Sequence, residues 1–475
     1  MRVFAFIISL LTLISLFVGC SQKYVLGGQP PVGLHCLFRQ NTESNSSDSE
    51  KTRAAFTMAQ DVRVAIIESP DKNRQLRLTL TTGIERHVKE LVMNGQEADE
   101  ETLKKAQGYP YSSEIDSYWV GPEGDRSEDW VGRFPAGVYA YSMEKLRALP
   151  LEPKRIGDRW NITANGKDYS AEGYATLTEV YKHAGRTIAV IKGSFKATWT
   201  NTSPGVEGPV TCTAKIDGYQ CEVDLTTHMP VSETLTRTIE AKAGKESQTF
   251  TERETMTLIE RQTLDNEKWQ PGITEFARAL PELDNPKGYT AAIKTIIAFA
   301  DANPESPCGK AVAEQIVSWS GKHVGKRFFD ITAMDNKGEW YNSAPLTKAD
   351  IEGKVFLLEF WETKCGPCVT AAPGLSAIYK DFKNRGFVMV GVTHEGNLTR
   401  EELEKDLKTI GITYPVFQDK GEVSLSKTFE NTGFPHAFLV DRKGTIVWEG
   451  HPGEEKFMRE LIEGVLGESA EKPNE

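Results

Sequence analysis

The most informative stretch of the chain reads Leu357-Leu358-Glu359-Phe360-Trp361-Glu362-Thr363-Lys364-Cys365-Gly366-Pro367-Cys368. It begins with the short apolar run of a buried strand and ends in a Cys-x-x-Cys motif at the start of a predicted helix. Unpaired N–H groups at a helix N-terminus favour negative charge, which lowers the pKa of the first thiol. Thiolate is the nucleophile of disulfide exchange, and the spacing keeps Cys368 within one helical turn. The motif therefore predicts a redox-active pair.

Three other uses of a Cys-x-x-Cys motif compete with redox chemistry. Haem attachment needs a histidine directly after the second cysteine, where this chain has Val369. A four-cysteine zinc site needs a second motif of the same kind, which the sequence lacks, so no metal site is predicted. A purely structural disulfide stays open on spacing alone.

The sequence around the motif alternates between strand and helix patterns. After Val324, short apolar runs alternate with amphipathic stretches, and this alternation predicts a central sheet covered by helices. The predicted strands are 355–361, 387–393, 437–440 and 445–448, and the predicted helices are 367–384, 400–410 and 454–466.

Several motifs in order resemble the thioredoxin superfamily, and in particular its exported, TlpA-like thiol–disulfide oxidoreductases. The resemblance covers about residues 324–467, a third of the chain. It is carried by Val324-Gly325-Lys326 with Phe329-Asp330-Ile331, by Trp361 and Gly366-Pro367 of the redox loop, by 386–392, by 433–441, and by Gly444, Trp448 and 450–452.

The resemblance implies a role for each residue of the site. Cys365 would be the attacking thiol and Cys368 the resolving one. Pro435 would be cis, which brings the backbone of Phe434 beside the disulfide to pair with a substrate strand. Glu359 falls where thioredoxins carry a buried acid that shuttles the proton of the resolving cysteine, and a buried carboxyl has the raised pKa that suits this task. The alternative for Glu359 is a side chain that points outward at the edge of the site.

The chain departs from the family pattern at three positions. Lys364 replaces the aromatic residue that often precedes the first cysteine, and its charge is expected to lower the thiolate pKa further or to bind acidic partners. Ala371 replaces a glutamate common in TlpA-like proteins. His436 follows the proline where a small residue is common, so it could titrate near the disulfide or simply pack. A peroxidase is the nearest competitor within the superfamily, but no Pro-x-x-x-Thr-x-x-Cys loop precedes Cys365.

The N-terminus reads as an export signal. Arg2 is followed by an almost unbroken apolar run over 3–18, shorter than the roughly 20 residues of a spanning helix. Residues 1–19 are predicted to be a signal peptide, and Cys20 to carry a lipid, because 16–20 resembles a bacterial lipobox. A plain secretory signal and an uncleaved anchor are the alternatives. Each version exports the chain to the cell envelope or periplasm, where disulfides are permitted.

The remaining sequence divides by composition. Residues 20–54 are expected to be a flexible tether because 41–50 is polar and has no apolar residue. Residues 55–270 read as a twisted, mainly antiparallel β domain, with short helices at 85–94 and 97–107. Residues 271–323 read as a helical connector between this domain and the α/β thioredoxin-like domain, and 468–475 as a tail.

Two further cysteines flank a predicted hairpin turn at Asp217-Gly218. Cys212 and Cys221 would lie directly opposite each other across a four-residue loop and could form a disulfide. Across a two-residue turn they would be diagonal neighbours and too far apart. Both possibilities stay open, and Cys36 and Cys308 have no assigned partner.

Composition limits the functions to consider. A chain of 475 residues is expected to form two or three domains, and its net charge of −11 argues against bulk attraction to nucleic acid or anionic lipid. The preferred hypothesis is a membrane-tethered thiol–disulfide oxidoreductase, favoured as a reductase because of Gly366-Pro367. It needs no cofactor besides its disulfide, and its partners would be protein thiols and disulfides and a membrane electron donor. The alternative is a cell-envelope binding protein whose β-rich domain binds a ligand, with the thioredoxin-like domain as a redox-sensitive accessory.

Overall fold

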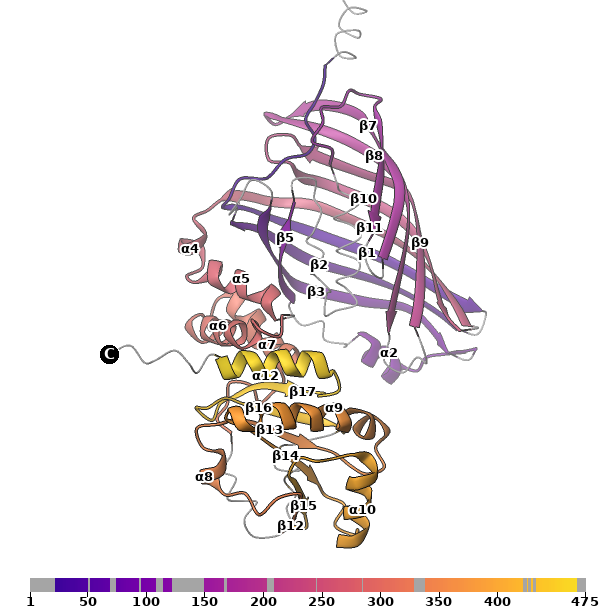
Figure 1. The fold of residues 1–475 in the computed structure, drawn as a ribbon. Coiled ribbons are helices and arrows are strands. Elements are labelled where there is room, and N and C mark those ends of the chain that lie inside the picture. Colours follow the sequence, from indigo (N-terminus) through magenta and orange to yellow (C-terminus); the bar gives the residue numbers. More distant parts are fainter. Residues whose placement is uncertain are drawn as a thin grey trace, which may run out of the picture. The chain divides into compact units, whose positions relative to one another are not determined.

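The computed structural model divides the chain into two compact units, Met1–Arg278 and Ala279–Glu475. Each unit is described by itself (Figure 1). The structure describes residues 22–49, 52–68, 74–93, 95–107, 114–121, 149–165, 169–202, 209–244, 246–283, 285–328, 338–421, 425, 429 and 433–467. The predicted signal peptide 1–19, the predicted lipid-anchor residue Cys20 and the predicted tail 468–475 lie outside these residues.

The N-terminal unit is built on one large antiparallel sheet, as the sequence predicts. Its strands are β1 (Leu34–Ser49), β2 (Thr52–Glu68), β3 (Gln75–Met93), β4 (Gln96–Glu97), β5 (Glu114–Val120), β6 (Arg159–Asn165), β7 (Tyr169–His183), β8 (Arg186–Thr202), β9 (Pro209–Asp224), β10 (Met229–Ala243) and β11 (Glu246–Thr263). Its helices are α2 (Glu100–Gln107), α4 (Asn266–Trp269) and α5 (Ile273–Glu282), the last of which runs across the division between the units.

The strand order is β4-β3-β2-β1-β11-β10-β9-β8-β7-β6, and β5 pairs with β3. The first long strand therefore pairs with the last, through a register that runs from Leu34 opposite Thr263 to Ser47 opposite Thr249. β7 and β8 are joined by a two-residue turn, Ala184-Gly185, in which both residues have positive φ. Figure 1 shows the sheet strongly curved, and several register shifts mark bulges, which bend strands and increase their twist.

One face of this sheet carries an apolar core. Along β8, Phe195, Ala197 and Trp199 are buried while Lys196 and Thr200 are exposed, which is the alternation of a sheet with one solvated face. The ring of Phe195 packs edge-on against Tyr219, with 5.3 Å between ring centroids. Gly193 leaves the space for this ring, since a Cβ there would lie 2.8 Å from Phe195 Cζ.

The prediction of a flexible tether over 20–54 is wrong for its polar stretch. Residues 41–49 belong to β1, which pairs with β2 on one side and β11 on the other. Strand pairing uses backbone N–H and C=O groups and needs no apolar side chain when neighbours exist on both sides. The polar side chains are also bonded, since the buried Ser44 donates to Glu252, which in turn pairs with Arg237 at 2.6 Å.

One of the two predicted short helices is also wrong. Residues 85–93 continue strand β3, where Glu85 lies opposite Ala59 and Val88 opposite Phe56. Pairing with β2 overrides the local helix preference, because it gives hydrogen-bond partners to backbone groups along the segment. The second predicted helix is confirmed in its C-terminal part as α2.

The predicted hairpin turn at Asp217-Gly218 is wrong, and so is any disulfide between Cys212 and Cys221. Both cysteines lie on the single strand β9, nine residues apart, and neither is disulfide-bonded. Nine residues of strand span about 30 Å, far beyond the Cα separation of a disulfide. Gly218 (φ +72°) instead marks a bulge, where the registers with both β8 and β10 shift. Aspartate-glycine suits a bulge as well as a turn because both need a positive φ.

The C-terminal unit is an α/β domain around a six-stranded mixed sheet, ordered β12-β15-β14-β13-β16-β17. The strands are β12 (Gly338–Tyr341), β13 (Val355–Phe360), β14 (Phe387–Thr393), β15 (Val416–Asp419), β16 (His436–Val440) and β17 (Ile446–Gly450). The helices are α6 (Tyr289–Ala302), α7 (Pro307–Ser320), α8 (Lys348–Ile351), α9 (Gly366–Phe382), the 3-10 turn η2 (Lys383–Arg385), α10 (Arg400–Ile410) and α12 (Glu455–Gly467).

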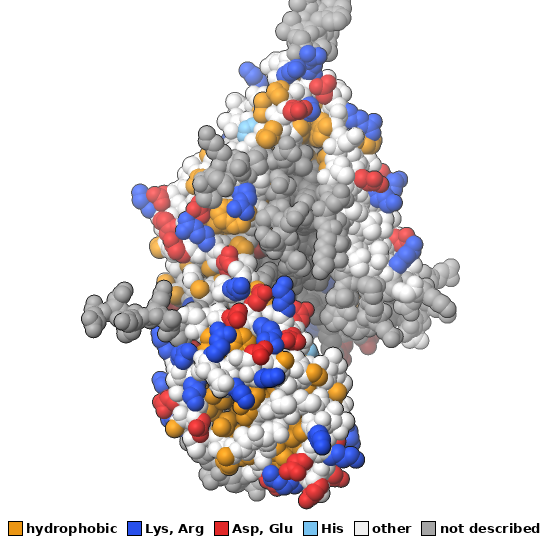
Figure 2. Space-filling view, viewed as in Figure 1, with side chains coloured by type: hydrophobic (Ala, Val, Ile, Leu, Met, Phe, Trp, Pro, Cys, Tyr) orange, Lys and Arg blue, Asp and Glu red, His pale blue; other side chains and the backbone are white. Residues whose placement is uncertain are grey.

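The central strand β13 is buried over its whole length, as its continuous apolar run predicts. Phe356, Leu358 and Phe360 join an apolar cluster on one face of the sheet. By the alternation of a strand, Glu359 points to the other face. Charged side chains of both signs are interspersed on the visible surface of this unit (Figure 2), an arrangement typical of a solvated surface.

The predicted connector 271–323 is helical, but it is not a free-standing link. Helices α6 and α7 pack against β17, and α6 also contacts α12, so both belong to the C-terminal unit. His323, just after α7, adds a polar tie, because its backbone N–H donates to Glu449 Oε2 at 2.9 Å. The apolar faces of α6 and α7 need a partner surface, and β17 and α12 supply it. None of the helices in the described ranges has the length and apolar character needed to cross a bilayer.

Candidate active site

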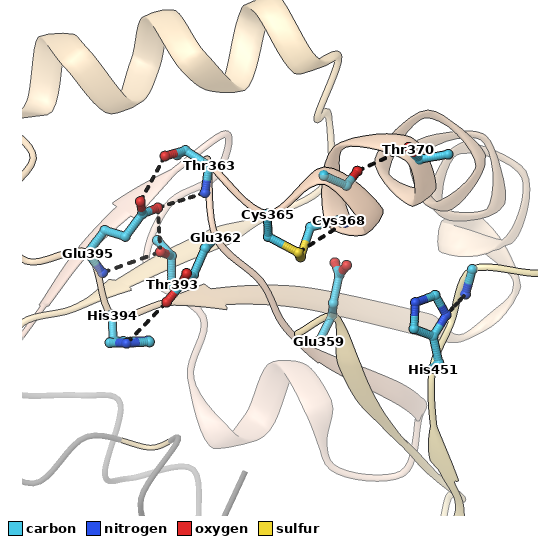
Figure 3. Close-up of a disulfide and its surroundings, with 12 residues drawn as sticks. Glu359, Glu362, Thr363, Cys365, Cys368, Thr370, Thr393, His394, Glu395 and His451 are labelled. Atoms are coloured by element: carbon cyan, nitrogen blue, oxygen red, sulfur yellow. Dashed lines mark hydrogen bonds and ion pairs between the residues drawn. A yellow bond between two sulfur atoms is a disulfide. The ribbon is translucent and has the colours of Figure 1, made fainter. Parts of the chain in front are cut away.

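The two cysteines of the motif form a disulfide at the N-terminus of α9 (Figure 3). Cys365 is the N-cap residue, with extended backbone angles, and its Sγ accepts a hydrogen bond from the Cys368 backbone N–H at 3.2 Å. Pro367 occupies the first turn, where a helix does not need its N–H. Cys365 is half-buried, whereas Cys368 is 1% exposed. A partner disulfide can therefore reach the first sulfur and not the second.

The predicted cis-proline loop has the expected geometry. The peptide bond between Phe434 and Pro435 is cis. Pro435 is buried and directly precedes β16, where His436 pairs with Phe360 at the end of β13. The loop therefore lies at the C-terminal end of β13, from which the chain enters the turn that carries Cys365. The ring of Phe434 stacks on His394, with 5.3 Å between centroids.

Glu359 is fully buried beneath the disulfide, which excludes the alternative of an outward-pointing side chain. Figure 3 shows its carboxyl group pointing toward the cysteine pair. Burial raises its pKa to about 8, although a hydrogen bond from Tyr414 acts in the opposite direction. A carboxyl group that titrates near neutral pH can accept or return a proton under working conditions.

A polar network that the sequence did not predict fixes the turn before Cys365. Glu395, just after β14, accepts hydrogen bonds from the backbone N–H and the hydroxyl of Thr363, both at 2.8 Å. Its neighbour His394 lies 3.3 Å from Glu362. Lys364, between this network and the disulfide, is exposed. The sequence signal that could have indicated Glu395 is its position after a predicted strand, since loops after the carboxyl ends of parallel strands often carry site residues.

The structure shows which side chain His436 contacts. Its Nε2 lies 3.2 Å from Glu449, which also binds His323 Nδ1 at 3.1 Å. Burial alone would raise the pKa of Glu449, but the hydrogen bonds from His436 and His323 outweigh it and leave that pKa below its ordinary value. His436 therefore anchors the strand after the cis-proline. No group of three potential metal ligands occurs within the described part of the chain.

Gly391, on the strand next to Glu359, is closely packed by buried aromatic rings. Gly391 on β14 lies opposite Glu359, and its N–H donates to the Pro415 carbonyl at 2.9 Å. A Cβ at this position would lie 2.8 Å from Tyr414 Cε2 and 3.0 Å from Trp361 Nε1. Both rings are buried, so neither can move aside freely. Glycine is needed here because two aromatic rings close over the backbone.

We expect Gly391→Ala to destabilise the C-terminal unit by about 1–3 kcal/mol, the usual range for overpacking a core. Urea unfolding followed by tryptophan fluorescence measures the change. Gly467→Ala is the matched control, because a Cβ there meets no described atom within 4 Å. Equal stability of the two variants would contradict the close packing of Tyr414 and Trp361 over Gly391.

Comparison with known proteins places this site in a family. The model of the AhpC/TSA family matches residues 324–449. The thiol-disulfide oxidoreductase ResA of Bacillus anthracis is 30% identical over 143 residues, which cover 30% of this chain and 76% of ResA. Protein DipZ of Mycobacterium tuberculosis is 30% identical over 124 residues, 24% of this chain. That match spans 18% of the length of DipZ. Among solved structures, a thiol-disulfide isomerase from Corynebacterium glutamicum is 26% identical, with a TM-score of 0.26 and coverage of 28% of this chain and 92% of the isomerase.

The matched region contains the Cys365–Cys368 disulfide, the cis-proline loop and the buried Glu359. The chain belongs, through its C-terminal unit, to the AhpC/TSA family, as a thioredoxin-like thiol–disulfide oxidoreductase domain related to ResA.

Proposed function

We propose that this protein is a membrane-tethered protein-disulfide reductase. The observation that carries the proposal is the placement of the Cys365–Cys368 disulfide at a helix N-terminus, above a buried carboxyl group whose pKa is about 8. The helix terminus stabilises a thiolate on Cys365, and the carboxyl group gives the buried Cys368 a proton acceptor.

In the proposed cycle, the Cys365 thiolate attacks one sulfur of a substrate disulfide. The substrate S–S bond breaks, a mixed disulfide forms, and the first substrate thiolate leaves. Glu359 then takes the proton of the Cys368 thiol, and the new thiolate attacks Cys365 Sγ. The second substrate sulfur leaves as a thiolate and takes a proton from water, so two electrons have passed from the pair to the substrate. A reduced thiol donor must then restore the pair.

The backbone beside the cis-proline is proposed to hold the substrate. Phe434 lies one residue before the buried Pro435, and an extended substrate segment would pair with its backbone while its disulfide meets Cys365. Lys364, directly before Cys365, is exposed, and its charge would stabilise the thiolate or attract acidic segments.

The proposed location and direction come from the sequence. The pattern of residues 1–20 supports export and attachment through Cys20, which would place the site where a membrane donor can supply electrons. Gly366-Pro367 resembles the loop of reducing thioredoxins, which supports reduction over oxidation. Direction finally depends on potential and on the donor.

The reduction potential of the pair tests this proposal. The purified protein that starts at residue 22 is equilibrated with dithiothreitol buffers, and the fraction of reduced Cys365 and Cys368 is measured by alkylation and mass spectrometry. We expect a value near that of thioredoxin, about −270 mV. A value near about −120 mV would make the protein a disulfide donor instead. If the cysteine pair exchanges with none of the buffers, the proposed redox function is wrong, and a binding role for the β-rich unit is favoured.

A further inference from the structure

The structure places a tyrosine, far from the cysteine motif in sequence, against the proposed proton acceptor. The Tyr414 hydroxyl donates to Glu359 Oε2 at 2.7 Å across a separation of 55 residues. Both side chains are completely buried. We propose that Tyr414 is a positioning residue that holds Glu359 in place to take the proton of Cys368 when the mixed disulfide is resolved. The inference rests on the proposed function and names a new residue for it.

The geometry divides the two carboxyl oxygens between two tasks. Tyr414 binds Oε2, while Oε1 has no hydrogen-bond partner among the residues that the structure describes. A buried carboxyl oxygen without a partner is costly, so it is kept where a use exists for it. The carboxyl group points toward the cysteine pair (Figure 3). Oε1 is therefore the oxygen left to accept a proton, and the bond to Tyr414 prevents the group from turning away.

Among the described residues, few groups around Glu359 can take up or release a proton. On β14 its neighbour is Gly391 and on β16 it is Ala437, neither of which titrates. The titratable groups that face it are Tyr414, from the segment before β15, and the two cysteines from α9. Within the part of the chain that the structure describes, Tyr414 is also the one side chain that acts on the Glu359 pKa, and it lowers that pKa against the effect of burial.

Tyr414 itself is held by contacts on three sides. Its carbonyl accepts from Asn342 Nδ2 at 3.0 Å, and the next carbonyl, of Pro415, accepts from Gly391 N–H. Ser376 on α9 accepts from the Thr413 N–H at 3.1 Å. The absent side chain of Gly391 leaves the space for the Tyr414 ring. The hydroxyl is thus aimed by the same helix and strands that carry the reacting groups, which is how a positioning residue acts.

The hydrogen bond from Tyr414 also favours one of the two protonation states of Glu359. Burial and the nearby Glu359 raise the pKa of Tyr414 well above its ordinary value, so the phenol stays protonated. A permanent donor favours the ionised carboxylate, the form that can take the Cys368 proton. Without the hydroxyl, Glu359 stays protonated to higher pH, and resolution slows at neutral pH while the first attack by Cys365 does not.

Tyr414→Phe tests this in a stopped-flow reaction of the reduced protein with 5,5′-dithiobis(2-nitrobenzoate). The first equivalent of released chromophore reports the attack by Cys365, and the second reports resolution by Cys368. We expect the second phase to slow about tenfold at pH 7 and its pH midpoint to rise by about one unit, the usual size of a lost hydrogen bond to a charged group. The first phase should not change.

Two controls separate positioning from a structural defect. Tyr379→Phe, on α9 and half-buried, removes a hydroxyl that does not touch Glu359, so the midpoint should stay unchanged. In a Glu359→Gln background, Tyr414→Phe should have no further effect on the second phase. Equal slowing of both phases, or an unchanged midpoint in Tyr414→Phe, would overturn the proposal.

Infrared titration of the Glu359 carboxyl group, identified by its loss in Glu359→Gln, gives a readout without any exchange reaction. It should also move to higher pH in Tyr414→Phe. This measurement separates a failure of the proposed function from a failure of the role of Tyr414. A protein that reduces no disulfide can still show the shift in the Glu359 titration, and then only the proposed function is wrong. An unshifted carboxyl band would overturn the role of Tyr414 by itself.

Discussion

Cys365→Ser is expected to reduce the rate of disulfide reduction to less than about one part in a thousand, because a serine hydroxyl is not ionised near neutral pH and cannot attack sulfur as a thiolate does. Cys365 is the less buried cysteine of the pair and caps α9, so the substitution removes the nucleophile and keeps the cap. The assay is reduction of insulin by the full chain with dithiothreitol as the electron donor.

Cys368→Ser should give a different result with the same loss of turnover. The first attack still occurs, but nothing resolves the mixed disulfide, so a stable covalent adduct with the substrate accumulates. Its mass is visible on non-reducing gels and disappears with dithiothreitol. An adduct in Cys365→Ser and none in Cys368→Ser would reverse the two roles.

Cys212→Ala is the matched control for these variants. Cys212 lies on β9 of the other unit, and burial raises the pKa of its thiol, so it is a poor nucleophile. Its removal should leave the rate of insulin reduction and the adduct of Cys368→Ser unchanged. A lower rate in Cys212→Ala would mean that a second thiol takes part in exchange.

Glu359→Gln is expected to stabilise the C-terminal unit increasingly as the pH rises, by about 5 kcal/mol at pH 9 relative to pH 4. The folded-state pKa of Glu359 is about 8, against an ordinary value of 4.5. Between these values the folded protein holds a proton that the unfolded chain has lost. The stability contribution of this group is therefore complete below pH 4.5, falls by about 1.4 kcal/mol per pH unit above it, and is lost above pH 8.

Hydrogen exchange of the β13 amides measures this effect, because a fully buried central strand exchanges through the largest opening of its unit. Wild type and variant are compared at each pH from 4 to 9, so the intrinsic exchange rates cancel. Glutamine keeps the shape and can accept the Tyr414 hydrogen bond, which isolates the charge. Glu362→Gln makes the same substitution on the half-buried turn before Cys365 and is the matched control. A difference between wild type and Glu359→Gln that does not change with pH would contradict the raised pKa.

The active-site motif could be predicted because its chemistry is local. Cys365 and Cys368 are three residues apart, and a helix start brings them to a Cα separation of 5.2 Å whatever surrounds them. The burial of Glu359 was implied by the resemblance to thioredoxins, with an outward-pointing side chain as the alternative, and the structure shows it fully buried. The supporting residues Tyr414 and Glu395 could not be predicted, because no local pattern marks a residue that meets its partner across strands.

The errors in the N-terminal unit have one common cause. Residues 41–49 and 85–93 have no apolar pattern that predicts a strand, and Asp217-Gly218 has a local preference for a turn. In the folded sheet, 41–49 lies between β2 and β11, and 217–218 lies between β8 and β10. Residues 85–93 pair with β2 along the segment and with β4 at Val92 and Met93. That backbone pairing outweighs side-chain preference and converts the expected tether, helix and hairpin into strand, strand and bulge.

Sequence alone was enough to predict the cysteine pair at a helix start and the order of a β-rich part before an α/β domain, since each depends on residues adjacent in the chain or on periodic apolar patterns. The cis-proline loop was implied by the family resemblance. Tertiary structure alone decided that β1 pairs with β11, that α6 and α7 belong to the C-terminal unit, and that Tyr414 binds Glu359. Those contacts join residues far apart in the chain, and they form only because burial and backbone hydrogen bonding are satisfied by the whole fold at once.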